Sequence, residues 1–347
     1  MNIYTNLEID GYEEVIRCDN HKVGFTAWIA IHNSNCGPAL GGCRVWQYEN
    51  EEAALTDVLR LSKGMTYKNA LAKLPLGGGK SVVHTDLNNV DRVALFEEIG
   101  NFVEFLDGRY ITAEDVNSTL QDMAAVKRKT NHVATVGASG NPSPFTAYGV
   151  YWAIRASVQH KLRKEQLDGL TVAIQGVGET GGRLAELLKQ DNCRIIATDI
   201  NQDHIQSLRE KIDFDVVEPE EIYSAPCDIF APCALGGILN HQTIPQLLCQ
   251  IVAGSANNQL LTEEDGERLH RRGILYAPDY AANAGGVINI SCEIGQRYDK
   301  QKALLLTAGI EKTLLEIYQL AHKQKLPTNI IANALAEDLF GINTAVC

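Results

Sequence analysis

The sequence predicts an α/β protein with two domains, and three observations lead to this prediction. The chain has 347 residues, which is enough for two domains of ordinary size. Apolar runs of strand length alternate with segments of helical periodicity, a pattern typical of sheets joined by crossover helices. The segment Gly137–Pro144 has the glycine, serine and proline content of a hinge. We therefore expect one domain over residues 1–135 and another over 136–324, with a C-terminal helix at 325–347 packing back on the first.

The elements of the first domain follow from local patterns. Asn50 is placed to cap a helix that begins with Glu51 and Glu52, where the helix dipole favours acidic residues. The glycines before Lys80 predict a turn that leads into a strand at 81–83. The expected strands are 12–18, 24–32, 81–83 and 109–113, and the expected helices are 50–72 and 90–106. Together these elements predict a mixed sheet.

The second domain alternates more regularly, which predicts a parallel sheet with helices on both faces. The expected helices are 146–160, 180–190 and 202–211, and the expected strands are 171–175, 193–198, 228–231, 251–254 and 274–277. A long amphipathic stretch at 299–323 and a shorter one at 329–339 complete the chain.

Composition excludes several classes of protein. With 45% hydrophobic and 21% charged residues, the chain has the balance of a folded globular protein. It contains no apolar run of the ~18 residues that a membrane helix needs, and its N-terminus lacks the features of a signal peptide. A net charge of −12 without a basic block argues against nucleic-acid and membrane partners. The nine cysteines have no zinc spacing, so we expect no metal site and a reducing, cytoplasmic environment.

A dinucleotide signature follows the predicted strand at 171–175. Gly176, Gly178 and Gly181 form a G-x-G-x-x-G motif at the start of a helix. In this motif the glycines permit a tight turn, a close approach of the backbone to a pyrophosphate, and close packing of helix on strand. Asp199 ends the next predicted strand, where a carboxylate can bind a ribose 2′-hydroxyl and repel a 2′-phosphate. The pattern predicts a Rossmann-type domain that binds NAD rather than NADP.

The first domain contains a second group of candidate residues: Lys68, Lys80 and Asp115. Lys80 stands between three glycines and an apolar strand, so its amine is expected in a partly dry space. Burial and a nearby cation both favour the uncharged amine, which can then act as a general base. A carboxylate could exchange protons with a substrate nitrogen, and a charged lysine could hold a substrate carboxylate. Joined to a hydride acceptor, this set fits the oxidation of an α-amino acid.

Long segments in the same order resemble the Glu/Leu/Phe/Val amino-acid dehydrogenase family over nearly the whole chain. These segments are Gly37–Gly42, Arg60–Lys68, Leu76–Lys80, Thr112–Val116, Gly140–Pro144, Asp228–Gly237 and Tyr276–Asn289. The resemblance implies an NAD-dependent enzyme that converts an L-amino acid to a 2-oxo acid and ammonia. It also implies a homo-oligomer and an active-site cleft between the two domains.

The resemblance also implies roles for individual residues. Lys80 would be the catalytic lysine, Asp115 would relay a proton, and Lys68 would bind the substrate carboxylate with help from Asn283. Further substrate-binding positions are Leu40, Gly41, Met65, Ala113, Val287 and Ile290. The cofactor-binding positions are Thr146, Gly176, Val177, Gly178, Glu179, Thr180, Gly181, Asp199, Ile200, Cys233, Ala234 and Asn258.

The predicted pocket side chains at positions 40, 113, 287 and 290 are all apolar. A pocket without a cation would leave the γ-carboxylate of glutamate buried and unpaired, at a cost of several kcal/mol. A branched aliphatic substrate is therefore expected, leucine first. An aromatic substrate, phenylalanine or tryptophan, is the nearest alternative. A catalytically silent NAD-binding regulatory protein is an alternative from another class, and the presence of all three polar residues argues against it.

Overall fold

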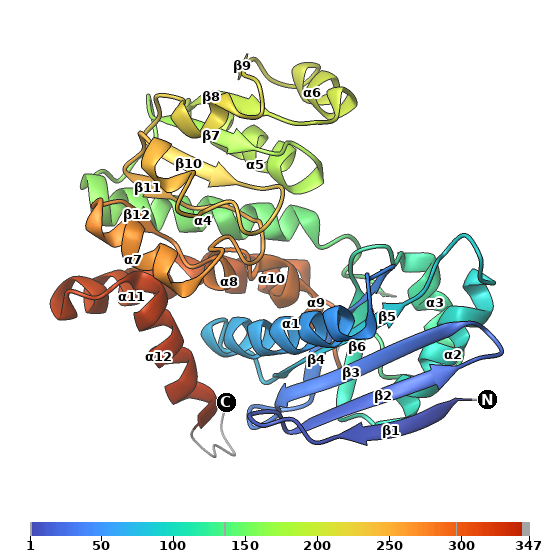
Figure 1. Cartoon of the computed structure of the whole chain (residues 1–347). Coiled ribbons are helices and arrows are strands. Elements are labelled where there is room, and N and C mark those ends of the chain that lie inside the picture. The colour runs from blue at the N-terminus through green and yellow to red at the C-terminus, as the bar shows by residue number, and fades with distance from the viewer. Residues whose placement is uncertain (1, 135–136, 296, 342–347) are drawn as a thin grey trace. The chain divides into compact units, whose positions relative to one another are not determined.

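The computed structural model describes residues 2–134, 137–295 and 297–341, which divide into two compact units (Figure 1). The described part of unit 1 consists of residues 2–134, 137–140, 290–295, 297–299 and 336–341. Unit 2 consists of residues 141–289 and 300–335. Each unit is built on its own six-stranded sheet. The α/β class predicted from the sequence is confirmed.

The sheet of unit 1 is mixed, with the strand order β1-β2-β3-β5-β4-β6. Neighbours from β1 to β5 run antiparallel, whereas β4 runs parallel to both β5 and β6. The strands are β1 (Ile3–Leu7), β2 (Glu14–Asn20), β3 (Phe25–Asn33), β4 (Ala39–Trp46), β5 (Gly77–His84) and β6 (Tyr110–Glu114). The parallel strands β4, β5 and β6 therefore direct their carboxyl ends to the same edge.

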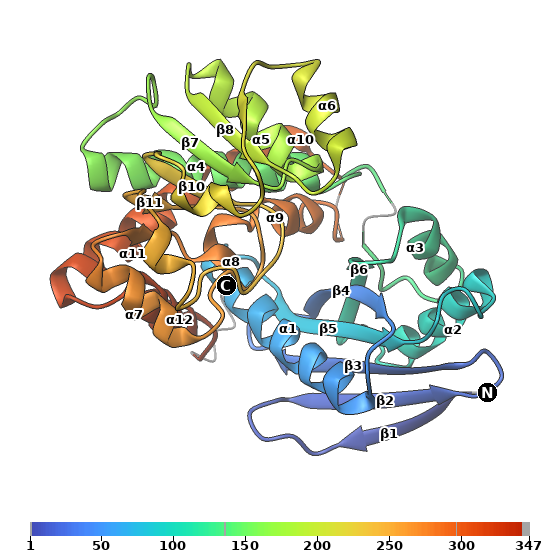
Figure 2. The ribbon, with the colours of Figure 1, turned by 45° about the horizontal axis from the view of Figure 1, so that its top comes forward.

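Helices cover both faces of this sheet (Figure 2). Helix α1 (Glu51–Leu71) packs Ala54 and Val58 against Trp28 and Val82 on one face. On the other face lie α2 (Arg92–Phe105) and α3 (Leu120–Lys127), whose apolar side chains join a core with β3, β4 and β6. As expected, Asn50 caps α1 by accepting a hydrogen bond from the Ala53 N–H at 2.8 Å.

Two sequence predictions for unit 1 were wrong. Strands β1 and β4 were not predicted, because neither has a long alternating pattern: β1 is mostly exposed and β4 contains adjacent glycines. The glycines at 77–79 are not a turn but the first residues of β5, which begins at Gly77. Their role is to let neighbouring elements approach the strand: a Cβ on Gly79 would lie 2.8 Å from a ring carbon of Tyr110.

The sheet of unit 2 is entirely parallel, as predicted, with the order β12-β11-β10-β7-β8-β9. The strands are β7 (Thr171–Gln175), β8 (Arg194–Thr198), β9 (Asp215–Val216), β10 (Ile229–Pro232), β11 (Ile251–Val252) and β12 (Leu275–Tyr276). Counted from β7, this is the 3-2-1-4-5-6 order of a Rossmann sheet. The order reverses between β7 and β10, and ligands bind at the carboxyl ends of strands around such a point.

Helices cover both faces of this sheet too. Helix α5 packs on β7 and β8 and against α4, whereas two 3₁₀ turns and α7 enclose an apolar cluster on the other face. The helical elements are α4 (Ser143–Leu162), α5 (Glu179–Gln190), α6 (Gln202–Arg209), η1 (Glu221–Ser224), η2 (Ile244–Gln246), α7 (Glu263–Arg271), α8 (Asp279–Ala282), α9 (Gly285–Ser291), α10 (Lys300–Ala308), α11 (Ile310–Gln324) and α12 (Thr328–Gly341). Helix α9 begins in unit 2 and ends in unit 1, and α12 does the same.

The stretch expected as one amphipathic segment at 299–323 is divided into α10 and α11 at Gly309, a residue with low helix propensity. Within the described ranges, no helix combines the length and the hydropathy needed to cross a bilayer.

Candidate functional site

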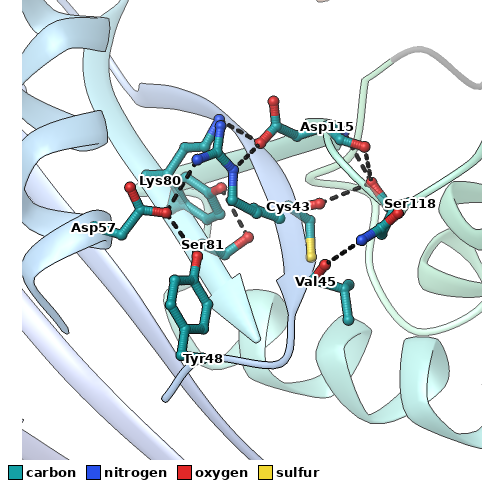
Figure 3. A network of polar contacts seen from close by, with 11 residues as sticks. Cys43, Val45, Tyr48, Asp57, Lys80, Ser81, Asp115 and Ser118 are labelled. Carbon is teal, nitrogen blue, oxygen red and sulfur yellow. Dashed lines mark hydrogen bonds and ion pairs between the residues drawn. The ribbon is translucent and has the colours of Figure 1, made fainter. Parts of the chain in front are cut away.

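A buried ion pair joins Lys80 to Asp115 in unit 1 (Figure 3). Lys80 belongs to β5 and Asp115 directly follows β6, and their Nζ and Oδ2 atoms are 3.1 Å apart. Lys80 is only 5% exposed, as its position among glycines and apolar residues predicts. Its strand neighbour Ala30 packs on the face that α1 covers, so the lysine side chain lies on that face. The structure thus brings together two of the three polar residues that the sequence singled out.

Arg44 completes this cluster, and sequence reasoning missed it. Its Nε donates to Asp115 Oδ2 at 2.9 Å, and its Nη1 donates to Asp57 Oδ2 at 3.0 Å. Asp57, on α1, also accepts a hydrogen bond of 2.6 Å from the Tyr48 hydroxyl. The arginine could have been found only from the register, because its partner on β5 is Val82, which lies two residues beyond Lys80 and on the same face.

The two cations determine the charge of Asp115. Burial raises the pKa of this carboxyl, but Lys80 and Arg44 outweigh that effect and lower the pKa to about 2. The carboxylate is therefore ionised at neutral pH and accepts hydrogen bonds without donating any. Both cations contact Oδ2, and Oδ1 accepts no hydrogen bond from the described residues. Oδ1 is thus available to a ligand.

The backbone around Asp115 is tied to β4. A Cβ on Gly42 would lie 2.6 Å from the Asp115 Cβ, so only glycine allows this approach. Asn117 has a φ of 59°, in the left-handed region that asparagine tolerates, and its side chain donates to the Val45 carbonyl. Ser118 accepts from the Asp115 N–H at 2.8 Å and donates to the Cys43 carbonyl at 2.7 Å. These contacts fix the position of the carboxylate (Figure 3).

The other substrate-binding candidates are divided between the units. Lys68 is half-buried on α1, two residues beyond Thr66, whose backbone touches β5 at Gly78. Leu40, Ala113, Val287 and Ile290 are all buried. Unit 1 holds Leu40, Gly41, Met65, Lys68, Ala113 and Ile290, whereas unit 2 holds Asn283 and Val287. Asn283 is buried, its Nδ2 donates to the Ser255 carbonyl and to Asn257 Oδ1, and its own Oδ1 has no hydrogen-bond partner among the described residues.

The glycine motif of unit 2 forms a narrow turn at the end of β7. Gly176 has a φ of 89°, and a Cβ there would lie 2.7 Å from that of Ala234, which follows β10. A Cβ on Gly181 would lie 1.9 Å from the Gly176 carbonyl oxygen. At Gly178, by contrast, the nearest atom to an added Cβ is 3.6 Å away, and no side chain caps helix α5 there. Unpaired N–H groups and open space at a helix N-terminus suit a phosphate group.

Asp199 lies beside this turn. Its Oδ2 accepts from the Val177 N–H at 2.8 Å, and its Oδ1 accepts from the Asn201 N–H at 2.8 Å. His204, which sequence reasoning did not select, places Nδ1 3.2 Å from Oδ2. The carboxylate thus joins the glycine turn to the end of β8, and its role in binding a ribose stays a prediction. Ile200, the next residue, is 88% exposed.

The remaining cofactor candidates lie around the same sheet edge. Glu179 begins α5 and accepts from the Asn141 side chain at 2.6 Å. The Cys233 N–H donates to the Gln175 carbonyl, and the Asn258 N–H donates to Asp279. Thr146 lies on α4, and Thr180 follows Glu179 on α5. A pocket of about 480 Å³ adjoins the turn, lined by residues that include Val177, Gly178 and His204.

The fold and these residues define a class: a two-domain α/β protein with a Rossmann sheet and a buried lysine–aspartate pair. Comparison with known proteins identifies the family. Residues 12–132 match the model described as Glu/Leu/Phe/Val dehydrogenase, dimerisation domain, and residues 199–329 match Glutamate/Leucine/Phenylalanine/Valine dehydrogenase. The chain belongs to this family of amino-acid dehydrogenases, which confirms the resemblance seen in the sequence.

Relatives with different named substrates are almost equally similar. Leucine dehydrogenase of Geobacillus stearothermophilus is 44% identical over 342 residues, covering 97% of this chain and 93% of the relative. L-tryptophan dehydrogenase of Nostoc punctiforme is 45% identical over 341 residues, covering 97% and 96%. A crystal structure of the Nostoc punctiforme enzyme superimposes with a TM-score of 0.84 at 44% identity, covering 96% of this chain and 97% of that one. Overall similarity therefore does not select the substrate.

Proposed function

We propose that this protein catalyses the reversible, NAD-dependent oxidative deamination of an L-amino acid with a branched aliphatic side chain, leucine first. The amino acid, NAD⁺ and water would give the 2-oxo acid, NADH, ammonium and one proton. The observation that carries the proposal is the buried ion pair between Lys80 and Asp115. An amine and a carboxylate held in contact out of water are suited to moving protons on a bound amino acid.

Each polar residue has a distinct role in this proposal. Lys80, once uncharged, removes a proton from the substrate ammonium and later activates the attacking water. Asp115 exchanges a proton with the substrate nitrogen through its unoccupied Oδ1. Lys68 binds the substrate carboxylate by its charge, and Asn283 supports that binding. NAD, when bound, supplies the acceptor for the hydride that leaves Cα.

The glycine turn of unit 2 supports the choice of cofactor. Gly178 leaves the N-terminus of α5 open, and the close contacts at Gly176 and Gly181 keep the turn narrow. We propose that a pyrophosphate binds there and that Asp199 binds the adenosine ribose. A negative charge at that position opposes a 2′-phosphate, so NAD would be preferred over NADP.

The apolar side chains at the expected substrate positions support the choice of substrate. Leu40, Ala113, Val287 and Ile290 offer no cation to the γ-carboxylate of glutamate. An aromatic substrate is the second candidate, because a relative named L-tryptophan dehydrogenase is about as similar to this chain, at 45% identity, as the leucine dehydrogenases are. One methylene changes the binding free energy by only ~1–3 kcal/mol in an apolar pocket. We therefore expect leucine, isoleucine and valine all to be substrates and to differ in kcat/KM.

A substrate panel tests this function. We expect NADH formation, followed at its absorbance, with leucine, isoleucine and valine, and the highest kcat/KM with leucine. Phenylalanine and tryptophan are the comparison substrates, and glutamate is the control for charge. A higher kcat/KM with tryptophan would replace the first candidate by the second, and turnover of glutamate alone would contradict the pocket argument.

Asp199 provides a test of cofactor choice. Asp199→Asn keeps an oxygen that can accept from the Val177 N–H but removes the charge, so the turn is retained. We expect the ratio of kcat/KM for NAD to that for NADP to fall about tenfold or more, because a repulsion of ~1–2 kcal/mol is lost. Asp203→Asn is the matched control, since Asp203 is exposed on the adjacent helix. An unchanged ratio in Asp199→Asn would remove this residue from the ribose site.

We also propose that the chain forms a cytoplasmic homo-oligomer. The family model that matches residues 12–132 is described as a dimerisation domain, which supports the assembly.

A further inference from the structure

Arg44 lies between two carboxylates. Its guanidinium contacts Asp115 through Nε at 2.9 Å and Asp57 through Nη1 at 3.0 Å. On Asp115 it shares a single oxygen, Oδ2, with the Lys80 amine at 3.1 Å. The side chains of Arg44, Asp57 and Asp115 are each between 20% and 27% exposed, so water screens these charges only partly.

This arrangement bears on the proton cycle of the proposed function, on which the present inference rests. To act as a base, Lys80 must first lose its proton and with it its positive charge. If Lys80 were the sole cation at this carboxylate, Asp115 would then be partly buried without a charged partner, a state that is strongly disfavoured. An arginine beside it removes this obstacle, because a guanidinium keeps its charge at any pH at which the protein works.

We propose that Arg44 is a positioning residue whose permanent charge holds Asp115 in place and stabilises its ionised form whenever Lys80 has released its proton. A lysine at position 44 would not have the same reach, since the two contacts use two nitrogens of one planar fork. Asp57 and Tyr48 hold the guanidinium at Nη1, a different nitrogen from the one that contacts Asp115. The Tyr48 hydroxyl donates to the Asp57 oxygen that Arg44 also contacts.

The other titratable groups near Asp115 are uncharged, so the lysine, the arginine and the two carboxylates determine the electrostatics of the cluster. Burial raises the pKa of the Cys43 thiol on β4 to about 12, and it raises the pKa of Tyr110 on β6. Burial and the hydrogen bond to Asp57 likewise raise the pKa of Tyr48. These three groups are therefore neutral at working pH. The charged groups are Lys80 on β5, Arg44 on β4, Asp57 on α1 and Asp115 itself, with Lys68 three turns beyond Asp57 on α1.

Arg44→Gln tests the proposal through the pH dependence of activity. Removing a cation opposes deprotonation of every remaining group around it, so the direction does not depend on which group titrates. We expect the pH at which kcat/KM for deamination is half-maximal to rise by about one unit or more. A purely structural contribution of Arg44 would lower activity without moving this midpoint. Thermal unfolding checks that the variant is folded. The unchanged protein must first be shown to deaminate its amino acid. If it does not, the proposed function is wrong; if it does and the midpoint of Arg44→Gln stays in place, the role of Arg44 is wrong.

Asp57→Asn gives a second test with the opposite sign. It removes an anion from the cluster and leaves Arg44 in place, so the midpoint is expected to fall below that of the unchanged protein. This variant still decides the question if Arg44→Gln does not fold. Arg17→Gln is the matched control, because Arg17 likewise binds two carboxylates of the same unit, Asp19 and Glu51, and neither belongs to the cluster around Asp115. The proposal is overturned if both variants keep the original midpoint, or if both shift it in the same direction.

Discussion

Replacing Lys80 with alanine is expected to lower kcat for oxidative deamination by about 10²–10⁴, because a positioned general base contributes a factor of that size. The amine is buried in β5 and held 3.1 Å from Asp115, so water cannot easily take its place. Binding of NAD is expected to be retained, since the glycine turn belongs to unit 2. The measurement is steady-state kinetics with a separate titration of NAD by fluorescence.

Two further variants make this test specific. Lys80→Gln keeps most of the side-chain volume and is expected to be as inactive as the alanine variant, which separates loss of the base from loss of packing. Lys63→Ala removes an exposed lysine of α1 and should leave kcat unchanged. If the Lys80 variants turned over at near the original rate with folded protein, Lys80 would not be the base and the role of Asp115 would have to be reassigned.

Local patterns were sufficient for most of unit 2. Strands β7 and β8 and helix α5 were predicted within one residue at either end, because each strand is a short apolar run and the glycine motif marks the turn between them. A parallel sheet that is covered on both faces leaves this signature in the sequence itself. The arrangement of Gly176, Gly178 and Asp199 followed from the same spacing.

The cluster around Asp115 was only partly predictable. Lys80 was recognised by its unusual neighbours in the chain, but Arg44 lies near the end of β4, a strand without a long alternating pattern, and has no local signal. Its role depends on β4 pairing with both β5 and β6, which places residues that are distant in sequence on one face. Pairing of this kind is a tertiary property, and the alternation of a single strand does not contain it. Asp57 and Tyr48 were missed for the same reason.

The glycines of β5 show how a local rule can mislead. Consecutive glycines usually mark a turn, and that was the prediction for residues 77–79. In the structure these residues are the start of strand β5. Glycine is needed there because helix α1 packs directly on the strand backbone. A Cβ on Gly78 would lie 2.0 Å from the Thr66 backbone nitrogen and 2.4 Å from its Cα. The sequence therefore encodes a close approach between helix and strand rather than a change of direction.

Gly78→Ala is expected to lower the stability of the protein, because the added Cβ would overlap the backbone of α1. The clash involves helix backbone, which cannot rotate away, so α1 must retreat from β5. Overpacking of this kind costs about 1–3 kcal/mol or more, which should lower the thermal unfolding midpoint by several degrees. Because Lys68 is two residues beyond Thr66, the retreat should also displace the proposed carboxylate anchor and raise KM for the amino acid.

The same helix contains the matched control for this prediction. Gly64 lies in the interior of α1, and an added Cβ there would meet nothing within 4 Å. Gly64→Ala is therefore expected to stabilise the protein by about 0.5–1 kcal/mol, since alanine favours the helix more than glycine does. Two identical substitutions that are fourteen positions apart should thus act in opposite directions. If Gly78→Ala unfolded at the same temperature as the unchanged protein, the close packing of α1 on β5 would be wrong, and with it the placement of Lys68 relative to Lys80.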